Sequence, residues 1–417
     1  MIIQRNTYLQ RLISLRHNGM IKIVTGIRRC GKSFLLSNIY AKWLKEQGVE
    51  SDHIIDINLE DRRNKDLRDP DELLAYIDSR ITDDRMHYVM IDEIQLVPEF
   101  EDVLNSYLNK SNVDVYVTGS NARFLSSSIR SEFAGRGDEI RLYPLSFKEF
   151  SIIRGNDKAE NLREYMIYGG MPQVVLRDSE KDKAEFLKGL FQRTYIRDIV
   201  ERYKIKNTDV LDELLNILAS SIGGLTNPTK LVNTFESVKH QKVNRMTLAS
   251  YLDYLCESFL TEKAEQYDIK GKRYIDSPYK FYFADCGLRN VRLNFRQIEF
   301  THLLENVIYN ELRIRGYNID VGVVPKQERI EDGKRVRQYY EVDFVCNQGS
   351  KRYYIQSAYR INDEYKIRQE ENSLRNIDDS FKKIIVIGEA TPIIRNEAGI
   401  TTISIYDFLL NENSLEL

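Results

Sequence analysis

Residues 26–33 read Gly-Ile-Arg-Arg-Cys-Gly-Lys-Ser and fill every fixed position of the phosphate-binding pattern G-x-x-x-x-G-K-[ST]. Residues 21–25 before this loop have the apolar character of a short buried strand, and residues 34–45 after it carry apolar positions at helical spacing. In a strand–loop–helix unit, the loop N–H groups and the helix N-terminus face an anion. The chain is therefore expected to build an α/β fold around a bound nucleoside triphosphate.

The loop residues have separate expected roles. Lys32 is expected to reach the β- and γ-phosphates, and the hydroxyl of Ser33 is expected to ligate Mg²⁺. We expect ATP rather than GTP, because the chain lacks an Asn-Lys-x-Asp motif that would read guanine. The residues expected to contact ATP are Gly26, Ile27, Arg28, Arg29, Cys30, Gly31, Lys32, Ser33 and Phe34.

A second motif lies at residues 88–93, which read Tyr-Val-Met-Ile-Asp-Glu. A strand buried on both faces of a parallel sheet reads as a continuous apolar run, and ligands bind at the carboxyl ends of such strands. The run is typical of a Walker B strand. We expect Asp92 to hold the Mg²⁺ shell and Glu93 to polarise the water that attacks the γ-phosphate.

A third strand is predicted at residues 113–118, and it ends in Gly119-Ser120-Asn121. A polar side chain at this strand end can contact the γ-phosphate or the attacking water. We assign this sensor role to Ser120, with Asn121 as the alternative. A plain turn is the competing interpretation, because Gly, Ser and Asn are all common in turns.

An arginine-bearing segment follows, and residues 138–142 after it predict a further strand. An arginine finger stabilises charge on the transferred phosphoryl group and can come from a neighbouring subunit. We expect Arg136, which stands between two glycines, to play this role, with Arg130 as the alternative. A surface arginine fits the pattern equally well. A finger acting in trans implies a homo-oligomer, for example a hexameric ring.

The order of these motifs indicates a P-loop core with an additional strand, closer to AAA proteins than to small GTPases.

Composition narrows the possible location and binding partners of the protein. The chain has no apolar run long enough to span a membrane and no apolar signal-peptide core, so a cytoplasmic protein is expected. Its four cysteines lack paired spacing, which argues against disulfides or zinc. The net charge of −2 means that any nucleic-acid surface must be local.

Several segments together resemble the prokaryotic AAA-type ATPases that carry a C-terminal domain of unknown function. The resemblance rests on Arg5–Leu9, Val24–Ser33, Thr118-Gly119-Ser120, Gly135-Arg136, Tyr143–Phe150 and Gly169-Gly170-Met171-Pro172. It covers essentially the whole chain. It implies an ATPase core over residues 1–150, a helical and winged-helix middle, and a C-terminal domain with a nuclease-like fold.

The middle of the chain is predicted to be helical at first. Gly169-Gly170-Met171-Pro172 interrupts the helical patterns, because Gly-Gly followed by Pro cannot continue a helix. We expect a helical lid over residues 151–207. Arg193 and Arg197 in this lid are candidates for a second nucleotide sensor, but solvent-exposed helix faces are the favoured interpretation.

A winged-helix domain is predicted over residues 208–290. Three helical patterns at 211–222, 228–235 and 246–260 precede two strand patterns at 261–267 and 272–275. The third helix of such a domain usually enters the DNA major groove. Residues 226–250 carry a net charge of +3, and the hairpin adds Lys270, Lys272 and Arg273. DNA binding is expected, with a packing or protein-binding module as the alternative.

The last segment, residues 291–417, is expected to form an α/β domain. Glu305 in a predicted helix, Asp343 in a predicted strand and Gln356 in the next are similar to the PD-(D/E)xK nucleases. Ala358 stands where the lysine of that pattern is expected. Lys351 or Lys366 could replace this lysine from elsewhere, but no pattern supports either, and nuclease activity is not expected. Further core strands are predicted at residues 321–325, 383–388 and 400–405.

Together the motifs favour an AAA-type ATPase that uses ATP and Mg²⁺ to move or remodel a macromolecule, with DNA as the expected partner. Three alternatives stay open. One is a slow nucleotide-dependent oligomerisation switch in signalling or phage defence. Another is an ATP-regulated nuclease, which Ala358 disfavours. The last is a protein-remodelling ATPase whose winged helix binds protein.

Overall fold

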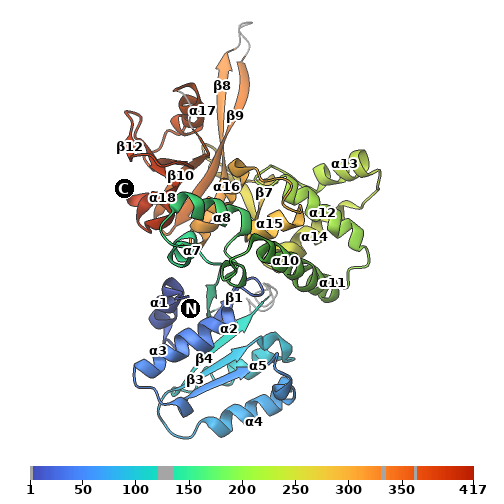
Figure 1. Ribbon diagram of the computed structural model, residues 1–417, viewed down its shortest axis with the longest axis vertical. Coiled ribbons are helices and arrows are strands. Elements are labelled where there is room, and N and C mark those ends of the chain that lie inside the picture. Colours follow the sequence, from blue (N-terminus) through green and yellow to red (C-terminus); the bar gives the residue numbers. More distant parts are fainter. Residues whose placement is uncertain (1–2, 121–134, 330–334, 361–363) are drawn as a thin grey trace. The chain divides into compact units, whose positions relative to one another are not determined.

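The computed structural model describes residues 3–120, 135–329, 335–360 and 364–417. The chain forms two compact units (Figure 1), which comprise Met1–Pro144 with Glu257–Phe259, and Leu145–Cys256 with Leu260–Leu417. Asn121 and Arg130, the alternative sensor and finger residues, lie outside the described residues. Within the described ranges, no helix combines the length and the apolar character that a membrane crossing requires.

The first unit is built on a parallel sheet in the order β2-β3-β4-β1-β5. Its strands are β1 (Ile21–Thr25), β2 (Ile54–Asn58), β3 (His87–Asp92), β4 (Val113–Gly119) and β5 (Gly137–Arg141). β4 lies between the phosphate-loop strand β1 and the acidic strand β3, which confirms the predicted additional-strand core. The carboxyl ends of these strands therefore meet at one edge of the sheet.

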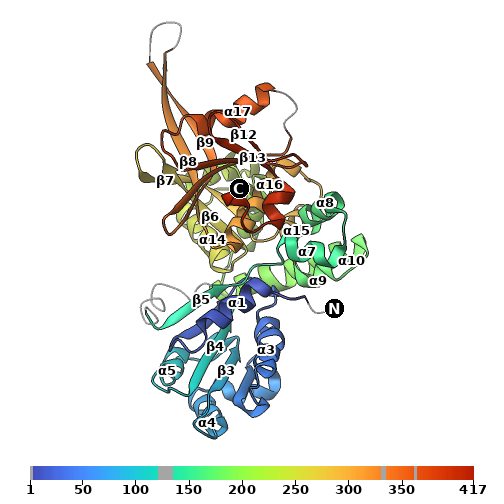
Figure 2. The same ribbon diagram turned by 90° about the vertical axis from the view of Figure 1, so that its left-hand side faces the viewer.

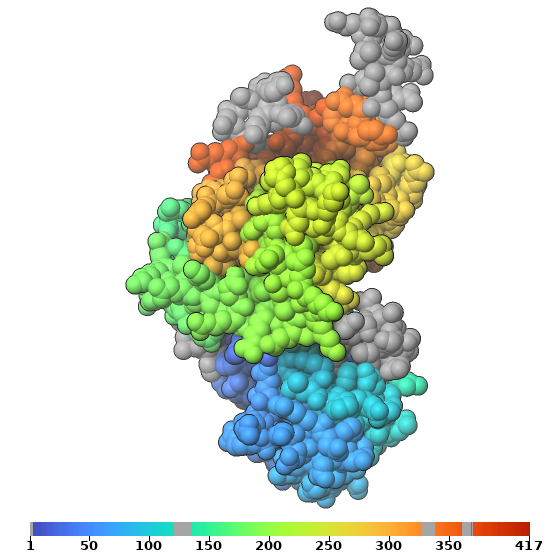
Figure 3. Space-filling view, turned by 90° about the vertical axis from the view of Figure 1, so that its right-hand side faces the viewer, coloured from blue at the N-terminus to red at the C-terminus, as the bar shows by residue number. Residues whose placement is uncertain are grey.

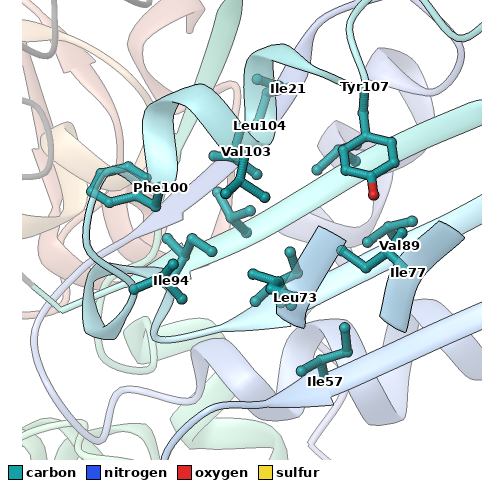
Figure 4. Close-up of a cluster of buried hydrophobic side chains, with 14 of the residues drawn as sticks. Ile21, Ile57, Leu73, Ile77, Val89, Ile94, Phe100, Val103, Leu104 and Tyr107 are labelled. Carbon is teal, nitrogen blue, oxygen red and sulfur yellow. The ribbon is translucent and has the colours of Figure 1, made fainter. Parts of the chain in front are cut away.

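Helices cover both faces of this sheet. They are α1 (Asn6–Leu15), α2 (Lys32–Phe34), the π-helical segment Leu35–Tyr40, α3 (Ala41–Glu46), α4 (Pro70–Arg80) and α5 (Phe100–Asn105). Figure 4 shows side chains of α4 and α5, such as Leu73 and Leu104, packed with strand residues that include Ile57 and Val89. Tyr116 of β4 meets the helix that follows the phosphate loop, since its hydroxyl lies 2.6 Å from that of Tyr40.

The second unit starts with a series of helices, and several of these begin at residues whose side chains cap the helix N-terminus. Ser146 and Glu149 form a capping box at the start of α7, and Asn227 caps α13, where Pro228 is the first residue. The helices are α7 (Phe147–Arg154), α8 (Lys158–Tyr168), α9 (Pro172–Val175), α10 (Glu180–Leu190), the π-helical segment Phe191–Ile196, α11 (Arg197–Tyr203), α12 (Thr208–Ser220), α13 (Pro228–Lys239), α14 (Arg245–Glu257) and α15 (Cys286–Arg292).

An eight-stranded mixed sheet forms the rest of this unit, in the order β12-β13-β11-β10-β9-β8-β6-β7. Its strands are β6 (Thr261–Asp268), β7 (Arg273–Phe283), β8 (Asn318–Arg329), β9 (Arg335–Gln348), β10 (Lys351–Ala358), β11 (Lys382–Ile387), β12 (Ile394–Arg395) and β13 (Ile400–Ser404). β8 and β9 project as a long ribbon from this sheet (Figures 1 and 2). The sheet packs with α16 (Phe300–Ile314), α17 (Glu364–Arg375) and α18 (Ile405–Leu410).

The predicted hairpin over residues 261–275 exists, but it is not a separate wing. Its strands are β6 and β7, and β6 pairs in parallel with β8 through Gln266–Asp268 and Val321–Val323. The sheet therefore crosses the expected domain boundary at residue 290. Main-chain groups along the β6 edge find partners in β8, so the hairpin is completed by the C-terminal strands rather than by the three helices before it.

The Gly169-Gly170 break between α8 and α9 has a specific packing cause. Asp285 is buried, and its Oδ2 accepts a hydrogen bond from the backbone N–H of Gly170 at 2.6 Å, while Oδ1 accepts one from Leu288 N at 3.1 Å. Gly169 has a φ of +76°, and a Cβ added there would lie 2.0 Å from Oδ1 of Asp285. Asp285 thus joins the turn between α8 and α9 to the start of α15, and only glycine fits at this turn.

This packing predicts that Gly169→Ala destabilises the second unit by about 2–4 kcal/mol, because the left-handed backbone and the clash with Asp285 both add cost. Gly189→Ala in α10 is the matched control. Apart from its chain neighbours and its own helix backbone, no atom lies within 4 Å of the added Cβ, so the stability of this variant is expected to stay equal or to rise by up to about 1 kcal/mol. Denaturant unfolding of both variants checks this; equal stabilities would contradict it.

Candidate nucleotide-binding site

The phosphate loop, residues 26–33, leaves β1 at a point where the backbone is tightly packed. Gly26 has a φ of +140°, and an added Cβ would lie 2.1 Å from the carbonyl oxygen of Leu142. Gly31 has a φ of +104° and directly precedes the helical run that starts at Lys32. Both positions therefore require glycine, so the two glycines of the motif are explained by backbone geometry.

The base of the loop is held by buried groups. Cys30 is fully buried, and its Sγ lies 3.5 Å from the carbonyl oxygen of Leu142. Burial raises the pKa of this thiol, so it stays protonated and acts as a packing group. The guanidinium of Arg5, also buried, donates to the carbonyl oxygens of Cys30 at 3.4 Å and Tyr143 at 2.7 Å. Arg5 thus ties the loop to the segment after β5.

Lys32 lies inside the loop rather than in solvent. Its Nζ donates to the carbonyl oxygens of Gly26 at 3.1 Å and Ile27 at 3.3 Å, and it lies 4.0 Å from Oε1 of Glu93. The ammonium group is therefore enclosed by the loop backbone and faces the acidic pair. This is the position from which a lysine can neutralise phosphate charge.

Asp92 is brought against Ser33 as expected. The Ser33 hydroxyl lies 2.8 Å from both carboxylate oxygens of Asp92, and the Thr118 hydroxyl donates to Oδ1 at 2.6 Å. Burial raises the pKa of Asp92, an effect that hydrogen bonds from both hydroxyls oppose. Hydroxyl and carboxylate oxygens are the ligands that Mg²⁺ prefers. Ser33 and Asp92 therefore fit a site for a magnesium ion.

Glu93 lies next to this carboxylate in an unusual backbone conformation. Its φ of 56° places it in the left-handed region, which costs a non-glycine residue about 1–3 kcal/mol. The Thr118 hydroxyl stabilises this turn, since it accepts a hydrogen bond from Glu93 N at 2.9 Å. The Glu93 carboxylate accepts hydrogen bonds from the Ser120 hydroxyl at 2.9 Å and from the Gln95 amide. Ser120 is thus brought to Glu93, at the position from which a sensor would act.

The remaining loop side chains point in different directions. Ile27 is buried, whereas Arg29 is exposed and has a φ of 68°. Arg28 forms an ion pair with Glu60, which follows β2. Phe34 is 40% exposed.

Arg136 lies at the amino ends of the strands, opposite the end that carries the phosphate loop. Its carbonyl oxygen accepts a hydrogen bond from Ile21 N at 2.9 Å, so it stands beside the start of β1, whereas the phosphate loop follows the end of that strand. Its exposed guanidinium is 3.4 Å from Oδ1 of Asn105. The structure thus does not bring Arg136 to the phosphate loop of its own chain.

The residues predicted for the second unit have clear surroundings. Arg197 pairs with Glu201 on its own helix, and Arg193 is exposed. Lys351 pairs with Glu416 at 2.6 Å, and the side chain of Lys366 lies outside the described residues. Glu305 and Asp343 lie on either side of Lys280 from β7, a residue that the sequence patterns did not indicate, and Gln356 contacts the backbone of Asp343.

Thr118 is the site residue that the sequence patterns missed. Its hydroxyl donates to the Asp92 carboxylate and accepts a hydrogen bond from the backbone N–H of Glu93, and the side chain is buried at the end of β4. A hydroxyl at the end of an otherwise apolar strand was the available signal. Its meaning depends on β4 lying next to β3, where Ile91 is paired with Val117, and this pairing is not visible in a single sequence.

The geometry therefore defines a P-loop nucleotide-binding unit with an acidic pair, and comparison with known families agrees. Residues 18–151 match a family described as AAA domain, and residues 159–299 match a domain of unknown function, DUF8612. An uncharacterized protein of Haemophilus influenzae is 35% identical over 418 residues, 98% of this chain and 99% of that protein. The chain belongs to the same protein family as this relative and carries an AAA domain.

More distant similarities extend further. An uncharacterized protein of Methanocaldococcus jannaschii is 29% identical over 394 residues, 88% of this chain and 84% of that protein. Among solved structures, the Aeropyrum pernix ORC1 protein in complex with DNA matches 70% of this chain and 93% of that chain at 10% identity, with a TM-score of 0.30. A likeness this remote carries no argument about function.

The position of Thr118 generates a prediction. Thr118→Val replaces the hydroxyl with a methyl group, so Glu93 N loses its acceptor and Asp92 loses a donor. Loss of a hydrogen bond to a charged group costs about 1.5–3 kcal/mol, so Mg²⁺-dependent affinity for ATP is expected to fall about 10- to 100-fold. Thr118→Ser keeps the hydroxyl and serves as the control. Titration of a fluorescent ATP analogue with and without Mg²⁺ measures both; equal affinities would contradict the role of the hydroxyl.

Proposed function

We propose that this protein is an ATP hydrolase that uses Mg²⁺ and couples turnover to movement or remodelling of a macromolecule, most favourably DNA. One observation carries the hydrolase proposal: Ser33, Asp92, Thr118, Glu93 and Ser120 form a continuous hydrogen-bonded chain beside the ammonium of Lys32. These are the residue types that phosphoryl transfer needs for metal, water and phosphate.

In the proposed reaction, the phosphate loop and Lys32 bind the phosphates and neutralise their charge. Ser33 and Asp92 would hold Mg²⁺, which supplies charge neutralisation at the β- and γ-phosphates when bound. Glu93 accepts a proton from, or orients, the water that attacks the γ-phosphate. The Ser120 hydroxyl, which lies 2.9 Å from the Glu93 carboxylate, fixes the direction of that carboxylate and senses whether the γ-phosphate is present.

The division of labour between Lys32 and Glu93 is testable. Lys32→Ala is expected to abolish ATP binding, because the loop loses the cation that it encloses. Glu93→Gln is expected to bind ATP with near-normal affinity and to lower its turnover by about 100-fold or more, since the amide cannot accept the proton. Glu99→Gln is a matched control, because Glu99 is also left-handed, with a φ of 52°, but is exposed. Binding and phosphate release are measured for each variant; normal turnover of Glu93→Gln would remove Glu93 from the mechanism.

The proposed DNA surface lies on α13 and α14, which form part of the yellow-green region in Figure 3. Several of the predicted basic residues are engaged within the second unit. Lys239 pairs with Glu213 at 3.1 Å, and Lys270 pairs with Asp378 at 3.3 Å. Lys242 lies in the loop before α14 and Arg245 is the first residue of that helix; both are exposed, and neither forms an ion pair with the residues that the structure describes. We place the phosphate contacts on these two side chains.

Charge reversal tests this surface. Arg245→Glu is expected to weaken duplex DNA binding about tenfold and to lower the slope of log K against log salt by about 1. Lys181→Glu changes the charge by the same amount on α10, where Lys181 is 81% exposed, and is expected to leave binding unchanged. Fluorescence anisotropy over a salt series provides both quantities. Equal losses in the two variants would mean that only net charge matters and would contradict a specific surface.

Assembly belongs to the same proposal. Arg136 is exposed at the sheet edge opposite its own phosphate loop, so it is accessible to a second copy of the chain. We propose that it acts in trans on the nucleotide of a neighbouring subunit in a homo-oligomer. This arrangement matches the chemistry of an arginine finger, which stabilises charge that develops on the transferred phosphoryl group.

A further inference from the structure

Lys280 of β7 is a buried lysine at the centre of three carboxylates. Its Nζ lies 2.9 Å from Oε1 of Glu305 on α16, 2.7 Å from Oε1 of Glu341 and 3.8 Å from Oδ1 of Asp343, both on β9. The Lys280 side chain is only 3% exposed. Burying an ammonium group costs much free energy unless carboxylates surround it, so the buried position of Lys280 requires these contacts.

The same carboxylates belong to an oxygen-rich cluster in the second unit. Oδ2 of Asp343 accepts hydrogen bonds from Ser357 N at 2.8 Å and from the Ser357 hydroxyl at 2.9 Å. The amide oxygen of Gln356 lies 3.4 Å from Asp343 N. Carboxylate and amide oxygens converging from a helix and two strands are a donor set typical of a hard divalent cation such as Mg²⁺ or Mn²⁺.

The donor set does not fit such a cation while Lys280 is present. In the part of the chain that the structure describes, the carboxylates of Glu305, Glu341 and Asp343 do not form a group whose ligand atoms all lie within 4.8 Å of one another. The oxygens are instead arranged around Nζ. Burial opposes the charge on Lys280, but Glu305, Asp343 and Glu341 outweigh it and raise the pKa of the ammonium group. A divalent ion at the same point would meet a fixed positive charge.

Other contacts limit the space and the donor capacity around Glu305. Oε1 of Glu305, already bonded to Lys280, also accepts a hydrogen bond from the Tyr282 hydroxyl at 2.7 Å. Gly223 approaches from α12's C-terminal side so closely that an added Cβ would lie 2.9 Å from Oε2. The carboxylate is therefore satisfied by groups of the chain itself, without a metal ion.

We propose that the Lys280 ammonium is a built-in cation that takes the place of a divalent metal ion in this cluster. The second unit then needs no metal to hold the cluster together, and it does not cleave phosphodiester bonds by metal-assisted hydrolysis. Removing the lysine side chain uncovers a latent divalent-cation site made of Glu305, Glu341 and Asp343. This inference is independent of ATP hydrolysis in the first unit.

The test is Mn²⁺ binding to the full chain, measured by isothermal titration calorimetry and by the electron paramagnetic resonance signal of free Mn²⁺. Lys280→Ala is expected to bind one more Mn²⁺ per chain than the unchanged protein. Any Mn²⁺ at Ser33 and Asp92 contributes equally to both and cancels. The double variant Lys280→Ala/Asp343→Asn is expected to lose the additional ion. Lys263→Ala, which removes a 40% exposed lysine on the neighbouring strand β6, is the control and should gain none.

Stability provides a second measurement if Lys280→Ala folds poorly. Three carboxylates without their cation repel each other, so the variant is expected to have a lower Tm, and millimolar Mn²⁺ is expected to raise that Tm but not the Tm of the unchanged protein. The proposal is overturned if Lys280→Ala gains neither an ion nor Mn²⁺-dependent stability. It is also overturned if Asp343→Asn alone removes a Mn²⁺ ion from the unchanged protein, because the site would then hold metal beside Lys280.

Discussion

The position of β4 between β1 and β3 is the constraint on which the candidate site depends. In a parallel sheet the carboxyl ends of adjacent strands meet, so this order brings the phosphate loop, the acidic pair and Thr118 to one edge. Thr118 then uses one hydroxyl twice, as donor to Asp92 and as acceptor for Glu93 N. That second bond stabilises the left-handed turn at Glu93. Without β4 in this place, the two acids would have no common partner.

The two units handle buried carboxylates in contrasting ways. In the first unit, neutral hydroxyl donors surround Asp92, and burial still raises its pKa, so the carboxylate keeps capacity for an external cation. In the second unit, Lys280 supplies a full positive charge inside the cluster of Glu305, Glu341 and Asp343. A neutral donor orients a carboxylate, whereas an ammonium group neutralises it. On the proposals above, this difference separates a site that binds a metal ion from one whose carboxylates are already neutralised by Lys280.

Local patterns predicted strands β1, β3, β4 and β5 of the first unit, the loop glycines, and the positions of Ser33, Asp92, Glu93 and Ser120 at strand or loop ends, because each follows directly from its own segment. Contacts between distant segments were not predictable. Thr118 gains its role from a neighbouring strand, and Lys280 reaches carboxylates that lie far from it in the sequence. The hairpin at residues 261–275 shows the same limit: the alternating pattern identified two strands, but not that β6 pairs with β8. A local pattern can predict a strand, but the neighbouring strand with which it pairs is set by the tertiary structure.

Steady-state ATP turnover with and without duplex, single-stranded and branched DNA tests the central claim most directly. The account predicts Mg²⁺-dependent phosphate release that rises with one of these DNA forms. The reason is that ATP hydrolysis at the carboxyl ends of β3 and β4 is proposed to be coupled to the movement or remodelling of DNA. Turnover that is the same with all three forms would contradict DNA as the partner and would favour a protein substrate or a nucleotide-dependent assembly switch. Complete absence of Mg²⁺-dependent turnover would contradict the hydrolase itself.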